Sequence, residues 1–221
     1  MTYWRFLLSA EDKLRQSSHP EVDYVFLTSL LNNYARPRQE ISRLVQKRAL
    51  LRVKKGLYVV SGDSAPPYSR HILANLVYGP SYVSLESALS FYGMIPERVV
   101  EITSVTCNRD KSFSTPAGEF SYRYLRPAYH FLGVAQEELS DGRHFLIATP
   151  EKALVDKLWF SRKEIEPVAS DLEAYLFEDL RIEPDVLARL NMRRLAGLID
   201  HYSAPIFAVL LGLLKSRKGN Q

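Results

Sequence analysis

Apolar and polar positions repeat with two different periods along this chain, and each period predicts a type of element. In residues 85–92 the apolar side chains recur at positions i, i+3, i+4 and i+7, which is the spacing of a helix with one buried face. In residues 119–124 aromatic and polar side chains alternate, as in a strand with one buried face. Similar reasoning predicts helices over 4–14 and 68–78, strands at 101–107 and 144–148, and a helix that begins at Thr149-Pro150.

The pattern between residues 22 and 60 predicts an extended piece, two helices and a hairpin. Residues 22–27 favour an extended piece, after which Thr28 can cap a helix. Pro37 is well placed to begin the next helix, in which the apolar side and the Arg48 stem face the core. Two β-rich runs then flank Lys54-Lys55-Gly56, where glycine can supply a positive φ. Helix, helix, basic helix and hairpin together predict a winged helix-turn-helix.

The positive charge of the chain is concentrated in this basic helix and hairpin. The chain has 29 Lys and Arg against 25 Asp and Glu, but eight of the basic residues lie between Arg36 and Lys55, beside the single acid Glu40. The rest of the chain therefore has 21 basic and 24 acidic residues. Such a local excess is typical of a surface that binds a polyanion.

We therefore expect the basic helix to enter the major groove of double-stranded DNA while the hairpin neutralises phosphates. A solvated basic helix beside an ordinary hairpin is the structural alternative. The residues expected to contact DNA are Arg36, Arg38, Gln39, Ser42, Arg43, Gln46, Lys47, Lys54 and Lys55.

A small, polar, proline-rich stretch at residues 61–67 is the best candidate for a linker. It predicts a winged-helix domain over residues 1–62 and a second domain over 68–221. The second domain is expected to be α+β, with a small, mostly antiparallel sheet and a helical C-terminal tail from residue 164 onward. The fold class of the whole chain is thus α+β.

Composition limits the cellular setting. The single cysteine, Cys107, excludes an internal disulfide and fits a reducing cytoplasm. Eleven apolar residues at 204–214 are too few to cross a bilayer, which needs about 20, so they predict a buried helix, with a membrane-surface anchor as the alternative. The five histidines lack the spacing of metal ligands, and we expect neither a metal nor a cofactor.

The order of several motifs resembles one group of proteins. These motifs are RVKKGLYVV (52–60), YVSLESALSFYGMIPE (82–97), ITSVT (102–106), STPAGEFSYRYL (114–125) and IATPEKALVDKLW (147–159). They are similar to those of the predicted transcriptional regulators of viral defence, the abortive-infection antitoxins of type IV toxin–antitoxin systems. The resemblance covers approximately residues 25 to 160.

The resemblance implies a protein with two functions. Its winged helix would bind repeats in the promoter of its own operon and repress it. Because a single winged helix reads only a few base pairs, we also expect two copies on the DNA. Its second part would counter a nucleotidyltransferase-like toxin, with or without direct contact. The charged residues at the family's hallmark positions are Glu86, Glu151, Lys152 and Asp156. Helix capping and an i,i+4 ion pair explain most of these residues without any function, and this structural reading is the preferred one.

A nucleic-acid-processing enzyme such as a nuclease is the alternative from another class. Metal-dependent nucleases cluster carboxylates with a lysine around the scissile phosphate. Glu101, Asp110 and Glu119 are candidate carboxylates, but no Glu-x-Lys follows them on a strand. No glycine-rich phosphate loop is present either, so we expect this chain not to be an enzyme.

Overall fold

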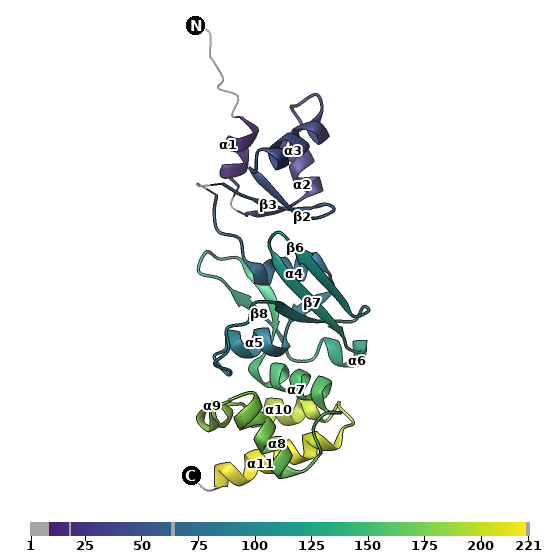
Figure 1. The fold of residues 1–221 in the computed structure, drawn as a ribbon, viewed down its shortest axis with the longest axis vertical. Helices are drawn as coiled ribbons and strands as arrows, with labels where there is room; N and C mark the ends of the chain where they lie inside the picture. The colour runs from purple at the N-terminus through teal and green to yellow at the C-terminus, as the bar shows by residue number, and fades with distance from the viewer. Residues whose placement is uncertain (1–8, 18, 63–64, 220–221) are drawn as a thin grey trace. The chain divides into compact units, whose positions relative to one another are not determined.

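The computed structural model describes residues 9–17, 19–62 and 65–219 (Figure 1). Its backbone contacts divide the chain into two compact units. The first unit is Met1–Val77 with Ser114–Gly118, and the second is Tyr78–Phe113 with Glu119–Gln221. The chain is α+β, as the sequence predicts.

In its described residues, the first unit contains a three-stranded antiparallel sheet, with strand order β1-β3-β2, and four helices. Side chains from α1, α2, α3 and all three strands form its core, with Leu27, Leu31 and Leu44 fully buried. Helix α4 follows the sheet. The elements are α1 (Ala10–Arg15), β1 (Glu21–Asp23), α2 (Tyr24–Leu30), α3 (Pro37–Gln46), β2 (Leu50–Lys54), β3 (Leu57–Val60) and α4 (Arg70–Val77).

Two local expectations about the first helices need correction. Helix α2 begins at Tyr24, where the Asp23 carboxylate accepts a hydrogen bond from the Phe26 amide at 2.7 Å. Thr28 therefore lies inside the helix and is not its cap. The cap is Asp23, five residues earlier, where the extended piece ends. The helix expected over residues 4–14 is described from Ala10, with Ser9 as its cap, and its earlier part lies outside the described residues.

Arg48 does not pack on the apolar side of the basic helix, as the sequence suggested. Helix α3 ends at Gln46, and Arg48 follows it with a left-handed φ of 60° and an exposed side chain. The amide of Ala49 donates to the Leu44 carbonyl at 2.9 Å, which closes the helix end. This backbone reversal directs the chain into β2 and takes Arg48 off the helix face.

The second unit is built on a six-stranded sheet with strand order β6-β7-β5-β4-β9-β8. It is larger than the small sheet that the sequence predicts, and its pairing is mixed: β4 pairs antiparallel with β5, and β8 pairs antiparallel with β9 over five positions. Strands β5 and β7 pair in parallel over five positions, and β4 also pairs in parallel with β9. The strands are β4 (Ser81–Val83), β5 (Ile102–Thr106), β6 (Lys111–Thr115), β7 (Gly118–Tyr124), β8 (Val134–Glu138) and β9 (His144–Ala148).

Helices complete the second unit. Helix α5 (Leu85–Phe91) packs on β5 and on α7 (Pro150–Ser161). Helix α10 (Met192–Ile199), which belongs to the helical tail, also packs on α7. The helical tail predicted from residue 164 is present, and Figure 1 shows it in green to yellow beside α7. The remaining helices are α6 (Pro127–His130), α8 (Ala169–Ala174), the π-helix η1 (Tyr175–Asp179), α9 (Pro184–Ala188), α10 (Met192–Ile199) and α11 (Pro205–Gly219).

Candidate functional site

Helix α3 presents one exposed polar surface, which we call the α3 face. Ile41 and Leu44 are buried against the unit, so the positions between them point to solvent. The predicted amphipathic character of this helix is confirmed. The α3 face brings together six of the nine residues predicted to contact DNA, namely Arg38, Gln39, Ser42, Arg43, Gln46 and Lys47, all of them exposed.

Two cations of the α3 face have acidic neighbours. The Arg43 guanidinium lies 3.3 Å from Glu40 Oε1, one turn earlier, and the Lys47 ammonium lies 3.0 Å from Glu11 Oε1 on α1. The Arg43 and Lys47 side chains are nevertheless 59% and 51% exposed. Surface ion pairs of this kind are weak, so both cations can exchange a carboxylate for a phosphate at little cost.

A cavity of about 620 Å³ lies at the N-terminal end of the same helix. Here the Arg38 Nε donates a hydrogen bond to the Tyr24 hydroxyl at 2.8 Å, so its side chain reaches toward α2. Arg36 stands at the cap position and has no side-chain capping bond. We call this cavity the arginine pocket; its lining residues are Tyr24, Thr28, Arg36, Pro37, Arg38 and Gln39.

The hairpin of β2 and β3 separates the two lysines that the sequence placed together at its tip. Gly56 has the left-handed φ, 84°, that the turn requires, and its carbonyl accepts from the Tyr24 amide at 2.9 Å. Lys55 is exposed, but the Lys54 ammonium is partly buried and donates to the Val77 carbonyl at 2.5 Å. Lys54 thus serves the fold of the first unit, whereas Lys55 is available to a ligand.

In the second unit, Lys152 and Asp156 lie at the centre of a buried polar network. Their side chains are completely buried, and the ammonium lies 2.8 Å from Asp156 Oδ1. Asp156 also accepts hydrogen bonds from the hydroxyls of Tyr82 at 2.9 Å, Ser84 at 2.8 Å and Tyr202 at 3.2 Å. Every acceptor site of the carboxylate is used, which is what stabilises a charge away from water.

Lys152 completes the network with two more hydrogen bonds. It donates to the Tyr129 carbonyl at 2.9 Å and to the Tyr202 hydroxyl. Burial lowers the pKa of Lys152, and the charge of Asp156 opposes that shift. The i,i+4 ion pair expected as the structural reading is confirmed, but the two groups are interior rather than superficial. A partner protein therefore does not reach them in this conformation.

The other two hallmark acids have different surroundings. Glu151 is 4% exposed, and its Oε1 accepts from the Asn191 amide at 2.9 Å, which ties α7 to the start of α10. Glu86, 35% exposed, pairs with Lys157 at 2.5 Å. Burial alone would lower the pKa of Lys157, but its hydrogen bond to Glu86 and the charge of that group raise it. Among the four hallmark acids and bases, Glu86 is the one that a ligand can reach.

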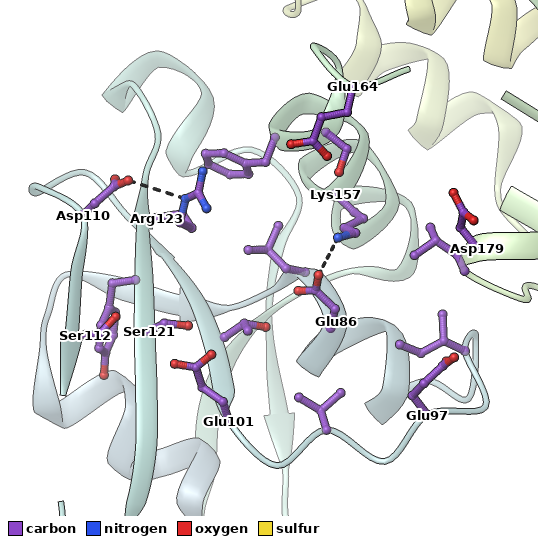
Figure 2. A pocket seen from close by; sticks show the side chains of 18 of the residues that line it. Glu86, Glu97, Glu101, Asp110, Ser112, Ser121, Arg123, Lys157, Glu164 and Asp179 are labelled. Atoms are coloured by element: carbon purple, nitrogen blue, oxygen red, sulfur yellow. Dashed lines mark hydrogen bonds and ion pairs between the residues drawn. The ribbon is translucent and has the colours of Figure 1, made fainter. Parts of the chain in front are cut away.

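Glu86 and Lys157 face a cavity of about 1030 Å³ in the second unit (Figure 2). Figure 2 shows a second ion pair across from them, between Arg123 and Asp110 at 3.5 Å. Six carboxylates and three cations line the cavity, so its charge is acidic. A phosphate group would be repelled from it.

The carboxylates considered for metal-dependent chemistry are only partly brought together. Glu101 and Asp110 line the acidic cavity, whereas Glu119 does not. Within residues 9–17, 19–62 and 65–219, no three His, Cys, Asp or Glu side chains are grouped so that they could hold a metal ion. No helix in those ranges combines the length and the apolar run needed to cross a bilayer.

Sequence reasoning missed several residues that matter for these sites. Tyr24 shapes the arginine pocket, but in the sequence it lies in the piece expected to be extended. Ser84 occupies a cap position yet gives its hydroxyl to Asp156, 72 residues later. Tyr82 and Tyr202 carried no sequence signal, because partners far apart along the chain are visible only in the fold.

Comparison with known proteins supports the fold alone. The chain matches no protein-family model, and no curated protein sequence matches it. Its fold is similar to the crystal structure of the RV2827C protein from Mycobacterium tuberculosis, with a TM-score of 0.63. That likeness covers 93% of this chain and 75% of the other, at 16% sequence identity. At this identity the likeness extends to the arrangement of helices and strands.

Proposed function

We propose that this chain binds double-stranded DNA through a winged helix-turn-helix in its first unit. Helices α2 and α3 with the β2–β3 hairpin are the parts from which such a module is made. The observation that carries the proposal is the α3 face, where a ten-residue helix buries two apolar side chains and exposes an unbroken set of Arg, Lys, Gln and Ser. Those are the side chains that read base edges and bind phosphates.

The biological role we propose is that of an autorepressor and antitoxin in a type IV toxin–antitoxin system. This part rests on the order of motifs that the chain shares with abortive-infection antitoxins. DNA binding by the first unit would repress the operon, and the second unit would counter a nucleotidyltransferase-like toxin in the cytoplasm. The helices and sheet around α7 would then act as a surface and not as a catalyst.

We expect two copies of the chain to bind a repeated DNA site, because the α3 face of one copy is small. One recognition helix contacts only a few base pairs, so specific binding needs two half-sites separated by whole helical turns. Footprinting on the DNA upstream of the gene tests this directly. We expect two protected half-sites and two chains per duplex, whereas one short protected site with one chain contradicts the arrangement.

The antitoxin role is tested by rescue of cells that express the toxin encoded beside this gene. We expect wild-type protein to restore growth and Glu86→Gln to reduce rescue, because Glu86 is the hallmark acid that borders the acidic cavity. Glu173→Gln is the matched control, since Glu173 forms an exposed ion pair with Arg217 away from that cavity. Failure of the wild-type chain to rescue growth contradicts the antitoxin role.

A further inference from the structure

The arginine pocket differs in charge from the other large cavities of the chain. Among the six described residues that line it, two are arginines and none is acidic. The cavity beside Glu86 is lined by six carboxylates, and the one beside Phe26 includes Glu21 and Asp23. A fourth cavity, beside Cys107, includes both Arg109 and Asp110. Among these four cavities of the described residues, the arginine pocket is the one lined by cations without an acid, which suits an anion.

A hydrogen bond within the pocket orients one of its two arginines. Because Arg38 Nε is bonded to the Tyr24 oxygen, the guanidinium plane is set and its terminal amino groups remain as donors. The Tyr24 hydroxyl accepts that bond, so its own proton can point at a ligand. An arginine held in this way loses less side-chain freedom when it binds an oxyanion than a mobile one does.

Arg36 adds the second guanidinium. It lies at the cap of a ten-residue helix whose first residue, Pro37, has no amide proton. The positive end of the helix dipole and the Arg36 charge therefore act at the same place as Arg38. Two guanidinium groups and a tyrosine hydroxyl line the pocket without a carboxylate, and that combination of charges and donors suits a phosphate group.

Resting on the proposed DNA-binding function, we propose that the arginine pocket takes one backbone phosphate of the bound duplex. Arg36, Arg38 and Tyr24 are then positioning residues that fix the depth and register of α3 and do not read bases. Base reading falls to side chains farther along the α3 face, namely Ser42, Arg43 and Gln46.

The test uses the full chain and fluorescence anisotropy with two duplexes, one from upstream of its own gene and one of shuffled sequence. Titrations run between about 50 and 200 mM KCl, the range in which phosphate contacts change affinity steeply. The variants are Arg36→Ala, Arg38→Ala and Tyr24→Phe. Arg189→Ala, an exposed arginine at the end of α9, is the charge-matched control. Thermal melting confirms that each variant is folded.

We expect each arginine variant to weaken binding to both duplexes about tenfold and to reduce the slope of log K against log [salt] by about 0.9. The ratio of the two affinities should not change. Tyr24→Phe should weaken both complexes about threefold with an unchanged slope, because it removes a neutral donor and frees the Arg38 side chain. Arg189→Ala should behave as wild type.

Three results are decisive against the inference. A fall in the affinity ratio toward one, with the slope unchanged, would mean that Arg38 reads a base. Unchanged affinity and slope in both arginine variants would mean that no DNA phosphate enters the pocket. Failure of the wild-type chain to bind either duplex contradicts the proposed function itself, and this inference falls with it.

Discussion

The Lys152 ammonium lies 2.8 Å from the Asp156 carboxylate, and neither side chain is exposed to water. Through Asp156 this pair joins α7 to Tyr82 and Ser84 at β4, and to Tyr202 just before α11. The pair therefore holds the helical tail to the sheet of the second unit. Lys152 and Asp156, two of the four residues that the resemblance marked for antitoxin function, are therefore part of the buried framework of the second unit.

Replacing Asp156 by alanine should destabilise the protein strongly. The change leaves the Lys152 ammonium buried without its counter-charge, which typically costs about 3–5 kcal/mol in the free energy of unfolding. Urea unfolding followed by circular dichroism measures it. Arg217→Ala, which breaks an exposed ion pair with Glu173, is the control and should cost less than about 1 kcal/mol. A loss below 1 kcal/mol for Asp156→Ala would show that the network is not needed.

Stability should fall as the pH drops below the ordinary histidine pKa of 6.5, in part because of His130. Burial lowers the pKa of His130, whose ring is 2% exposed between Tyr82 and Phe131. Below pH 6.5 the unfolded chain binds a proton there while the folded chain does not, so the free energy of unfolding decreases until the lowered pKa is passed.

His130→Phe tests this contribution because phenylalanine keeps the ring contacts and cannot be protonated. We expect the variant to lose less stability than wild type between about pH 7.5 and about pH 5.5. Urea unfolding at the two pH values gives the comparison. An equal loss in both proteins would show that His130 plays no part in it.

Glu11 should limit the affinity for DNA. Its carboxylate pairs with Lys47 of the α3 face at 3.0 Å and competes there with phosphates. Glu11→Gln removes that competition and one negative charge, so we expect binding about two- to threefold tighter, with stability changed by less than about 0.5 kcal/mol. Gel shifts measure the affinity, and Glu173→Gln in the second unit is the control. Weaker binding by Glu11→Gln would contradict the expected orientation of α3.

The two lysines of the hairpin should behave differently. Lys55 is exposed, so Lys55→Ala should reduce the salt slope of DNA binding by about 0.9. Lys54 donates to the Val77 carbonyl, so Lys54→Ala should instead lower the free energy of unfolding by about 1 kcal/mol and leave the slope nearly unchanged. Equal effects of the two substitutions on the slope would contradict this division.

The sequence predicts elements whose causes are local. The apolar spacing of Ile41 and Leu44 indicates the orientation of α3, and Gly56 indicates the hairpin turn. Thr149 and Pro150 indicate the start of α7, where the Thr149 hydroxyl accepts from the Lys152 amide at 3.3 Å. Capping, helical periodicity and positive φ act over a few residues, so a single sequence carries them.

Features set by distant contacts could not be predicted in the same way. Strand β4 has three residues and no alternation, and its partners β5 and β9 come from different parts of the chain. An i,i+4 pair such as Lys152 and Asp156 has the same spacing on a surface as in a core. The one available signal was the apolar run Ala153-Leu154-Val155 between them, which is typical of a helix buried on several sides.

The central claim is that the α3 face recognises DNA, and charge reversal at Arg43 tests it most directly. Arg43 is 59% exposed in the middle of that face, so Arg43→Glu should leave the protein folded and cost about 1 kcal/mol in the free energy of unfolding, mainly through repulsion from Glu40. Gel shifts with upstream and shuffled duplexes should show at least about tenfold weaker binding to the upstream duplex and an affinity ratio close to one. Equal affinity of wild type and Arg43→Glu for the upstream duplex would contradict the claim.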